Sequence, residues 1–98
     1  MKLDHVALNV NSISKAIEWY AKTCDATVLY EDSTWGLVSV GEAKIAFTLH
    51  EDHPAHIAFS VDSLSDFPSD CEPKQHRDGS TYFYKSDPWG NIIEFIKY

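Results

Sequence analysis

The chain has 98 residues, the size of one domain, and its hydrophobic content of 44% is typical of a folded globular protein. Its formal net charge of −7 opposes binding to a phosphate backbone or an anionic membrane surface, so we expect no nucleic-acid or membrane partner. It has no apolar run of roughly 18 residues and no signal-peptide pattern, which predicts a cytoplasmic protein.

The first predicted elements are a strand and a helix. Residues 5–10 alternate bulky apolar side chains with small or polar ones, which is the period of a half-buried strand. Ser12 or Ser14 can cap a following helix, whose apolar residues recur at helical spacing as far as Cys24. We expect this helix on the bulky face of the sheet, because His5 and the other small or polar residues then line an open face.

Three further strands are predicted before residue 54. Their patterns lie at about 26–31, 35–40 and 43–50. The turn-forming pairs Asp32-Ser33 and Gly41-Glu42 separate them. The first half of the chain therefore has the predicted element order βαβββ.

The opening phrase of the chain occurs twice. Asp-His-Val-Ala-Leu-Asn-Val stands at residues 4–10 and Ala-His-Ile-Ala-Phe-Ser-Val at residues 55–61, with His5 and His56 at the same place. Such an internal match indicates duplication. It predicts a single domain, residues 1–98, with module one at about 1–53 and module two at about 54–98.

The second module is predicted to repeat the first in shorter form. A short helix from Ser63 is limited by Pro68. The predicted strands lie at residues 56–61, 74–77, 81–85 and 91–98. The expected fold class is therefore α+β, with two tandem βαβββ modules that form cupped mixed sheets and carry helices on the outer face.

One acidic residue and two histidines form a candidate metal site. The last strands of the two modules align so that Glu94 corresponds to Ala46, with apolar neighbours on both sides, and a buried carboxylate is costly without a partner. Its alternation places Glu94 on the same face as His5 and His56. Two histidines and a carboxylate suit a divalent ion such as Zn²⁺, Mn²⁺, Fe²⁺ or Ni²⁺ and leave positions for a substrate with two adjacent oxygens. The alternative is that the inherited histidines only hydrogen-bond within the sheet, with Glu94 paired to one of them.

These phrases resemble a known superfamily. The module openings "DHVALNV" and "HIAFSV" and the closing "DPWGNIIEF" are similar to the vicinal oxygen chelate superfamily, which includes glyoxalase I, fosfomycin-resistance transferases, bleomycin-resistance proteins and extradiol dioxygenases. The resemblance covers essentially the whole chain. It implies that His5, His56 and Glu94 are the metal ligands. It does not specify the reaction, because these proteins share a scaffold but not a chemistry.

Within the superfamily the resemblance favours one type of reaction over another. Glyoxalase I has a fourth ligand where this chain has Ala46, which argues against its isomerase activity. The stretch "KQHRDGSTYFY" is similar to the fosfomycin-resistance transferases and implies that Lys74, Arg77 and Tyr84 match their positions, with Lys74 and Tyr84 holding an anionic substrate. Ala7 replaces their hydroxyl residue, so a smaller or different substrate is expected. Bleomycin-resistance proteins usually lack the ligand residues that this chain has.

Other polar and aromatic residues are candidates for substrate contacts. His50 shares the parity of Ala46 and is a candidate general base or substitute ligand, unless it lies in the loop before Pro54. The hydroxyl groups favour Tyr82 and Tyr84 as ligand contacts, although alternation alone leaves open which face they take. Trp35 is a candidate pocket wall. His76 and Arg77 are expected beside a turn, in contact with solvent.

The expected function is that of a metal-dependent enzyme for a small substrate that chelates the metal through two oxygens. The metal would stabilise an oxyanion, and the resemblance suggests thiol transfer or a lyase-type reaction, with Tyr84 and His50 as catalytic groups. The alternative is a protein that binds or sequesters a small molecule without catalysis. A short chain with little core also predicts a homodimer whose sites lie at the module or subunit interface.

Overall fold

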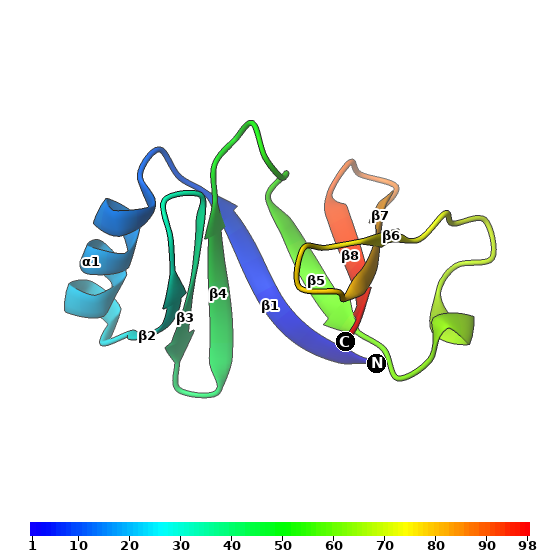
Figure 1. Cartoon of the computed structure of the whole chain (residues 1–98), viewed down its shortest axis with the longest axis horizontal. Helices are drawn as coiled ribbons and strands as arrows, with labels where there is room; N and C mark the ends of the chain where they lie inside the picture. Colours follow the sequence, from blue (N-terminus) through cyan, green and yellow to red (C-terminus); the bar gives the residue numbers. More distant parts are fainter. The chain divides into compact units, whose positions relative to one another are not determined.

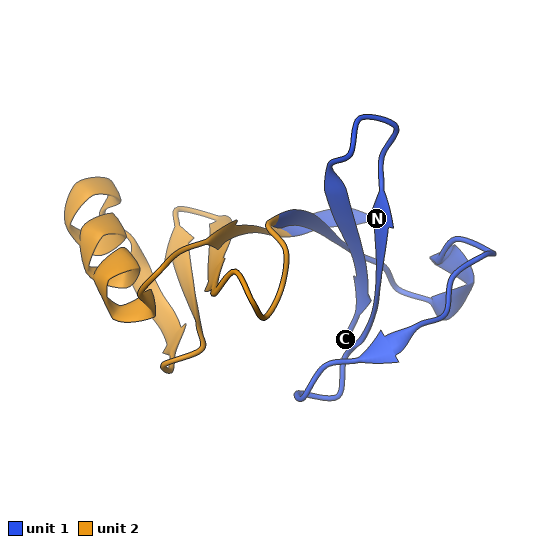
Figure 2. Ribbon diagram, turned by 90° about the horizontal axis from the view of Figure 1, so that it is seen from above, with its two compact units in different colours: residues 1–4, 56–98 blue, residues 5–55 orange.

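The computed structural model describes all 98 residues, and the chain divides into two compact units (Figures 1 and 2). As Figure 2 labels them, unit 1 consists of residues 1–4 together with residues 56–98, and unit 2 of residues 5–55. Both contain strands, and one contains an α-helix, so the α+β class is confirmed. None of the helices has the length and apolar character that a membrane crossing requires.

The unit of residues 5–55 contains the helix and most of the apolar core. Its strands lie in the order β2-β3-β4-β1, with β1 parallel to β4 and the other neighbours antiparallel. The elements are β1 (Lys2–Asn9), which begins in the other unit, α1 (Ile13–Cys24), β2 (Thr27–Glu31), β3 (Trp35–Val40) and β4 (Ala43–Thr48). Their order agrees with the prediction, but β4 ends two residues before the expected His50.

Helix α1 is capped at both ends and covers one face of this sheet. The Ser12 hydroxyl accepts a hydrogen bond from the backbone N–H of Lys15 at 3.4 Å, which confirms one of the two predicted caps. Asp25 ends the helix in the left-handed conformation, with φ of 56°. The fully buried core consists of Ile13, Ile17, Val38 and Phe47. Burying these side chains is what holds the helix on the sheet.

Gly36 permits the close approach of α1 to β3. A Cβ atom at this position would lie 2.7 Å from Ile17 Cδ1 and 3.0 Å from Ile13 Cγ2. Both isoleucines are buried, so neither can move aside without disturbing the core. We expect Gly36→Ala to lower the free energy of unfolding by about 1–3 kcal/mol, measured by urea denaturation.

Removing the obstructing methyl group provides the control for this prediction. Ile17→Val deletes Cδ1 and alone should cost about 0.5–1.5 kcal/mol. Combined with Gly36→Ala, it should cost less than the sum of the two single changes, because the clash is then relieved. Strict additivity of the two changes would show that Gly36 does not act through this contact.

Unit 1, residues 1–4 and 56–98, contains four neighbouring strands. Its strands lie in the order β5-β8-β7-β6, with β5 parallel to β8 and the other neighbours antiparallel. The elements are β5 (His56–Ser60), the 3-10 helix η1 (Leu64–Asp66), β6 (Lys74–Gln75), β7 (Thr81–Ser86) and β8 (Ile92–Lys97). The Tyr98 hydroxyl donates a hydrogen bond to Asp4 Oδ2 at 2.5 Å and so joins the two ends of the chain.

The short helix predicted from Ser63 is present in unit 1 as the 3-10 helix η1, and this unit has no α-helix. Ser63 caps the turn by accepting from the backbone N–H of Ser65, but only the three residues of η1 follow. Pro68 excludes a longer helix, because a proline at that distance would interrupt its hydrogen bonds. The outer face of this sheet is consequently covered only in part: 39% of Ile57 and 52% of Leu64 are exposed. The outer helix is therefore an α-helix in unit 2 and a single 3-10 turn in unit 1.

In each of the two parallel strand pairs, an alanine lies opposite the position that Glu94 or its counterpart Ala46 occupies. In unit 2, Ala7 of β1 lies opposite Ala46 of β4, and in unit 1, Ala58 of β5 lies opposite Glu94 of β8. Glu94 therefore has in its sheet the place that Ala46 has in the other. All four residues are buried.

Candidate metal centre

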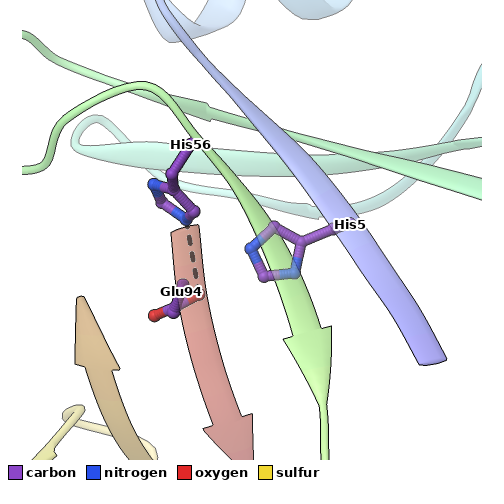
Figure 3. Close-up of side chains that lie close together, drawn as sticks. All are labelled: His5, His56 and Glu94. Carbon is purple, nitrogen blue, oxygen red and sulfur yellow. Dashed lines mark ion pairs between the residues drawn. The ribbon is translucent and has the colours of Figure 1, made fainter. Parts of the chain in front are cut away.

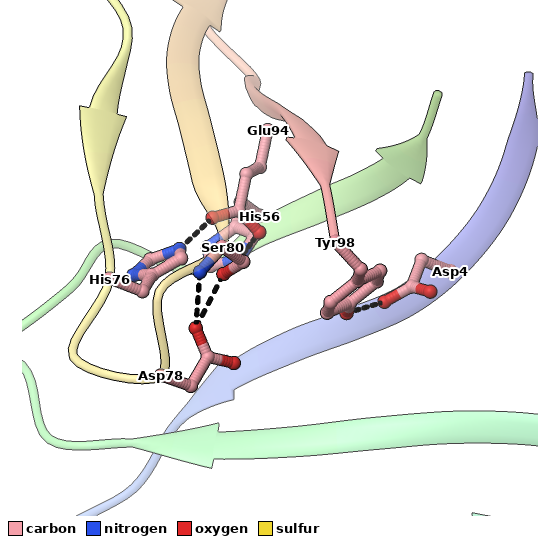
Figure 4. A network of polar contacts seen from close by, with 7 residues as sticks. All are labelled: Asp4, His56, His76, Asp78, Ser80, Glu94 and Tyr98. Carbon is pink, nitrogen blue, oxygen red and sulfur yellow. Dashed lines mark hydrogen bonds and ion pairs between the residues drawn. The ribbon is translucent and has the colours of Figure 1, made fainter. Parts of the chain in front are cut away.

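The candidate site centres on the carboxylate of Glu94, which is buried in unit 1. Only 1% of this residue is exposed, and the side chain makes an ion pair with a histidine through each of its two oxygens. Oε1 lies 3.3 Å from Nε2 of His56 (Figure 3), and Oε2 lies 2.7 Å from Nε2 of His76 (Figure 4). The burial of a carboxylate is expensive, so these two imidazoles compensate for the lost water.

The neighbouring histidines also set the protonation state of Glu94. Burial raises the pKa of this carboxyl, but hydrogen bonds and favourable charge interactions with His56 and His76 outweigh burial and lower the pKa from 4.5 to about 2. The carboxylate is therefore ionised at neutral pH. An ionised, buried oxygen donor is what a hard or borderline divalent metal ion requires.

A tyrosine from the adjacent strand borders His56 and Glu94. Tyr84 of β7 lies directly opposite Glu94 of β8, and its ring meets the ring of His56 edge-on, with centroids 5.1 Å apart. Burial, followed by the negative charge of Glu94, raises the pKa of Tyr84 above its ordinary value of 10.0. The phenol therefore keeps its proton at neutral pH and can donate a hydrogen bond.

The structure contains one group of possible metal ligands, and it consists of the three residues predicted from the sequence. His5, His56 and Glu94 each offer one ligand atom, and these atoms all lie within 4.8 Å of one another (Figure 3). His5 follows directly after Asp4 in β1 and is partly buried, whereas His56 is 8% exposed. Two imidazoles and an ionised carboxylate fit the donor preferences of Zn²⁺, Mn²⁺, Fe²⁺ and Ni²⁺.

The predicted substrate residues of unit 1 lie along the hairpin of β6 and β7. Tyr82 has the same parity as Tyr84, so both tyrosines take the face of the sheet that Glu94 takes. Lys74 lies opposite Tyr82 in β6 and is exposed. Arg77 is exposed in the turn that follows. Their roles as substrate contacts stay predictions.

Trp35 and His50 belong to the other unit. The ring of Trp35 stacks on Tyr30, with centroids 4.7 Å apart and planes inclined by 25°. His50 was expected at the end of a strand, but β4 ends at Thr48 and His50 lies in an exposed turn. The turn begins where the backbone N–H of Asp52 donates to the carbonyl of Leu49 at 3.1 Å. Strand parity therefore does not orient His50, and its catalytic role stays a prediction.

His76 is the residue of this site that the sequence did not reveal. We expected it to be solvated beside a turn, but only 23% of its side chain is exposed and it contacts Glu94. Its ring also stacks on Tyr82, with centroids 3.7 Å apart and planes inclined by 11°. The relevant signal in the sequence was the turn-forming Asp78-Gly79 pair, because a hairpin there brings His76 back beside the strand of Tyr82.

Comparison with known proteins finds one matching protein family. Residues 2–95 match the family described as the Glyoxalase/Bleomycin resistance protein/Dioxygenase superfamily. No curated protein matches the sequence.

Several solved structures have a similar fold at low sequence identity. A hypothetical protein from Bacillus halodurans has a TM-score of 0.76 and 20% identity over 99% of this chain and 94% of its own. Methylmalonyl-CoA epimerase from Mycobacterium tuberculosis has a TM-score of 0.76 and 20% identity over 98% of this chain and 87% of its own. A glyoxalase/bleomycin resistance protein/dioxygenase superfamily member from Vibrio splendidus has a TM-score of 0.68 and 13% identity over 95% of each chain.

Proposed function

Because the chain belongs to the glyoxalase/bleomycin resistance protein/dioxygenase superfamily, we propose that it is a metal-dependent enzyme for a small substrate that binds the metal through two oxygen atoms. His5, His56 and Glu94 are the proposed metal ligands. The observation that carries the proposal is the ionised carboxylate of Glu94, of which only 1% is exposed. It belongs to a ligand group whose atoms lie within 4.8 Å of one another.

The charge and composition of this group support a metal role over a purely structural one. A buried ion pair contributes little net stability, because the desolvation of its two groups offsets the attraction between their charges. A divalent ion would bind the same buried carboxylate together with two imidazoles. When bound, the metal supplies Lewis acidity that stabilises negative charge developing on substrate oxygens.

The residues around the ligands have separable proposed roles. Tyr84 holds its proton at neutral pH and can donate a hydrogen bond to a substrate oxygen beside His56. Tyr82, Lys74 and Arg77 lie on the same hairpin or its turn and are proposed to contact the substrate. The cationic groups of Lys74 and Arg77 suit an anionic substrate. The reaction we propose is thiol transfer or a lyase reaction.

The structural relatives do not select the substrate. Methylmalonyl-CoA epimerase is one protein with this fold, but at 20% identity the likeness shows the fold alone. The net charge of −7 disfavours a substrate with several negative charges. A compact molecule with two adjacent oxygens is therefore the proposed substrate class. We further propose a homodimer, since a 98-residue chain buries a modest share of its surface.

Binding of a small two-oxygen chelator tests this function. We expect acetohydroxamate to bind the metal-loaded protein, measured by isothermal titration calorimetry, and not to bind the metal-stripped protein. Acetamide, which has a similar size but offers only one oxygen, should bind at least about tenfold more weakly, because it forms no chelate. Equal binding of acetohydroxamate with and without metal would contradict the proposal and favour a metal-free binding protein.

A further inference from the structure

One histidine of the polar network lies outside the proposed ligand set but holds the same carboxylate. We propose that His76 is a positioning residue, which fixes the carboxylate of Glu94 for metal binding without itself binding the metal. This inference rests on the proposed metal-dependent function and adds a fourth residue to it.

The two oxygens of Glu94 have different partners at different distances. The shorter contact joins Oε2 to His76 Nε2 at 2.7 Å, and the longer one joins Oε1 to His56 Nε2 at 3.3 Å. The 2.7 Å contact is a strong, charge-assisted hydrogen bond and therefore sets the rotation of the carboxylate. Oε1 is thereby directed to the side of His56, where the proposed ligands meet. Ligating carboxylates in metal sites are commonly fixed by such outer hydrogen bonds.

The tautomer that this contact requires withholds one nitrogen of His76, Nε2, from a metal ion. An ionised carboxylate can only accept hydrogen bonds, so Nε2 of His76 must carry the hydrogen. A ring nitrogen that bears a hydrogen offers no lone pair to a metal ion. The group of possible ligands correspondingly contains His5, His56 and Glu94. His76 therefore acts on the metal through Glu94.

The hairpin turn holds His76 in this orientation (Figure 4). The backbone N–H of His76 donates to the carbonyl of Ser80 at 2.9 Å, and its carbonyl accepts from the N–H of Gly79 at 2.9 Å. Asp78 Oδ1 accepts from both the backbone N–H and the hydroxyl of Ser80, at 2.9 and 2.6 Å. With the ring stacked on Tyr82, both the backbone and the imidazole plane are fixed. The donor is thus preorganised, and little entropy is lost when it orients Glu94.

Substitutions that separate stacking from hydrogen bonding test the proposal. His76→Phe keeps a flat ring for Tyr82 but removes the donor. His76→Gln keeps an N–H donor of similar reach, and His76→Asn has the same amide one methylene shorter. Each full-length variant is stripped of metal, checked for cooperative thermal unfolding, and titrated with Co²⁺, whose visible absorption spectrum reports on ligand geometry.

We expect the donor and its reach to decide the result. His76→Phe and His76→Asn should bind Co²⁺ about 10–100-fold more weakly than the wild type, with a changed visible spectrum. His76→Gln should retain the wild-type spectrum and an affinity within about fivefold, a rescue that a purely structural role of the ring would not give. Gln75→Ala, which alters an exposed residue of the same hairpin, is the matched control and should behave like the wild type.

The failure of this inference is distinguishable from that of the proposed function. If the wild type takes up no Co²⁺, the metal-dependent function fails and the role of His76 fails with it. If the wild type binds Co²⁺ but His76→Phe and His76→Asn bind it with the same affinity and spectrum, only the role of His76 is overturned. A loss in His76→Gln equal to that in His76→Phe would likewise contradict positioning through a hydrogen bond.

Discussion

Replacing Glu94 by glutamine should weaken the binding of a divalent metal ion by more than about 100-fold, since even outer partners of metal ligands contribute 10–100-fold. Glutamine has nearly the shape of glutamate, so the sheet should remain intact. It removes the negative charge of the carboxylate, which faces the imidazoles of His56 and His76. The affinity can be measured by competition with a fluorescent Zn²⁺ chelator.

An exposed glutamate provides the control for this substitution. Glu72→Gln makes the same chemical change at an exposed position outside the strands and should leave the metal affinity unchanged. Both variants should unfold cooperatively, which separates loss of metal from loss of fold. If Glu94→Gln bound the metal ion with wild-type affinity, the carboxylate of Glu94 would not be a metal ligand.

Truncating Phe47 should have the largest effect on stability. This side chain is fully buried between helix α1 and the sheet, and the centroid of its ring lies 5.0 Å from that of Tyr20. Phe47→Ala should lower the free energy of unfolding by about 3–5 kcal/mol, through lost apolar burial and the cavity left behind. In a domain of this size, that loss corresponds to a fall in Tm of more than about 10 °C. Thermal unfolding of the metal-free protein measures it.

A conservative change at the same position separates cavity formation from other effects. Phe47→Leu retains most of the apolar volume and should cost less than half as much as the alanine variant. The difference matters because unit 2 contains the only α-helix of the structure, and the core of this unit holds that helix on the strands. A loss below about 1 kcal/mol for Phe47→Ala would show that this core contributes little to stability.

The strands of this fold were largely predictable, because period-two alternation is a local signal. The patterns at residues 35–40 and 81–85 correspond to β3 (Trp35–Val40) and β7 (Thr81–Ser86). Helix α1 was predictable for a related reason, since apolar residues at helical spacing follow the cap at Ser12. Each of these signals is complete within one short segment.

Short segments without a periodic pattern were harder to predict. Only a 3-10 turn follows Ser63, because the helical signal before Pro68 is too short to form an α-helix. His50 lies outside β4 because the backbone turns at Leu49, a feature that alternation does not reveal. The end of a strand is set by hydrogen bonds to neighbouring strands, which a sequence does not show directly.

The site shows the same division between local and long-range signals. The burial of Glu94 was predictable because this residue stands within an apolar strand. The pairing of His76 with Glu94 was not predictable, because it depends on a hairpin turn and on the stacking of His76 against Tyr82. Strand alternation also left open the facing of Tyr82 and Tyr84, which the pairing of β7 with β8 decides.

Metal stoichiometry tests the central claim most directly. The wild-type protein, stripped with a chelator and reloaded separately with Zn²⁺, Mn²⁺, Fe²⁺ or Ni²⁺, should retain one equivalent per chain of at least one ion after gel filtration, determined by elemental analysis. His5→Ala and His56→Ala should each lose that equivalent. Failure of the wild type to retain any of the four ions, or full retention by both histidine variants, would contradict a metal centre built from His5, His56 and Glu94.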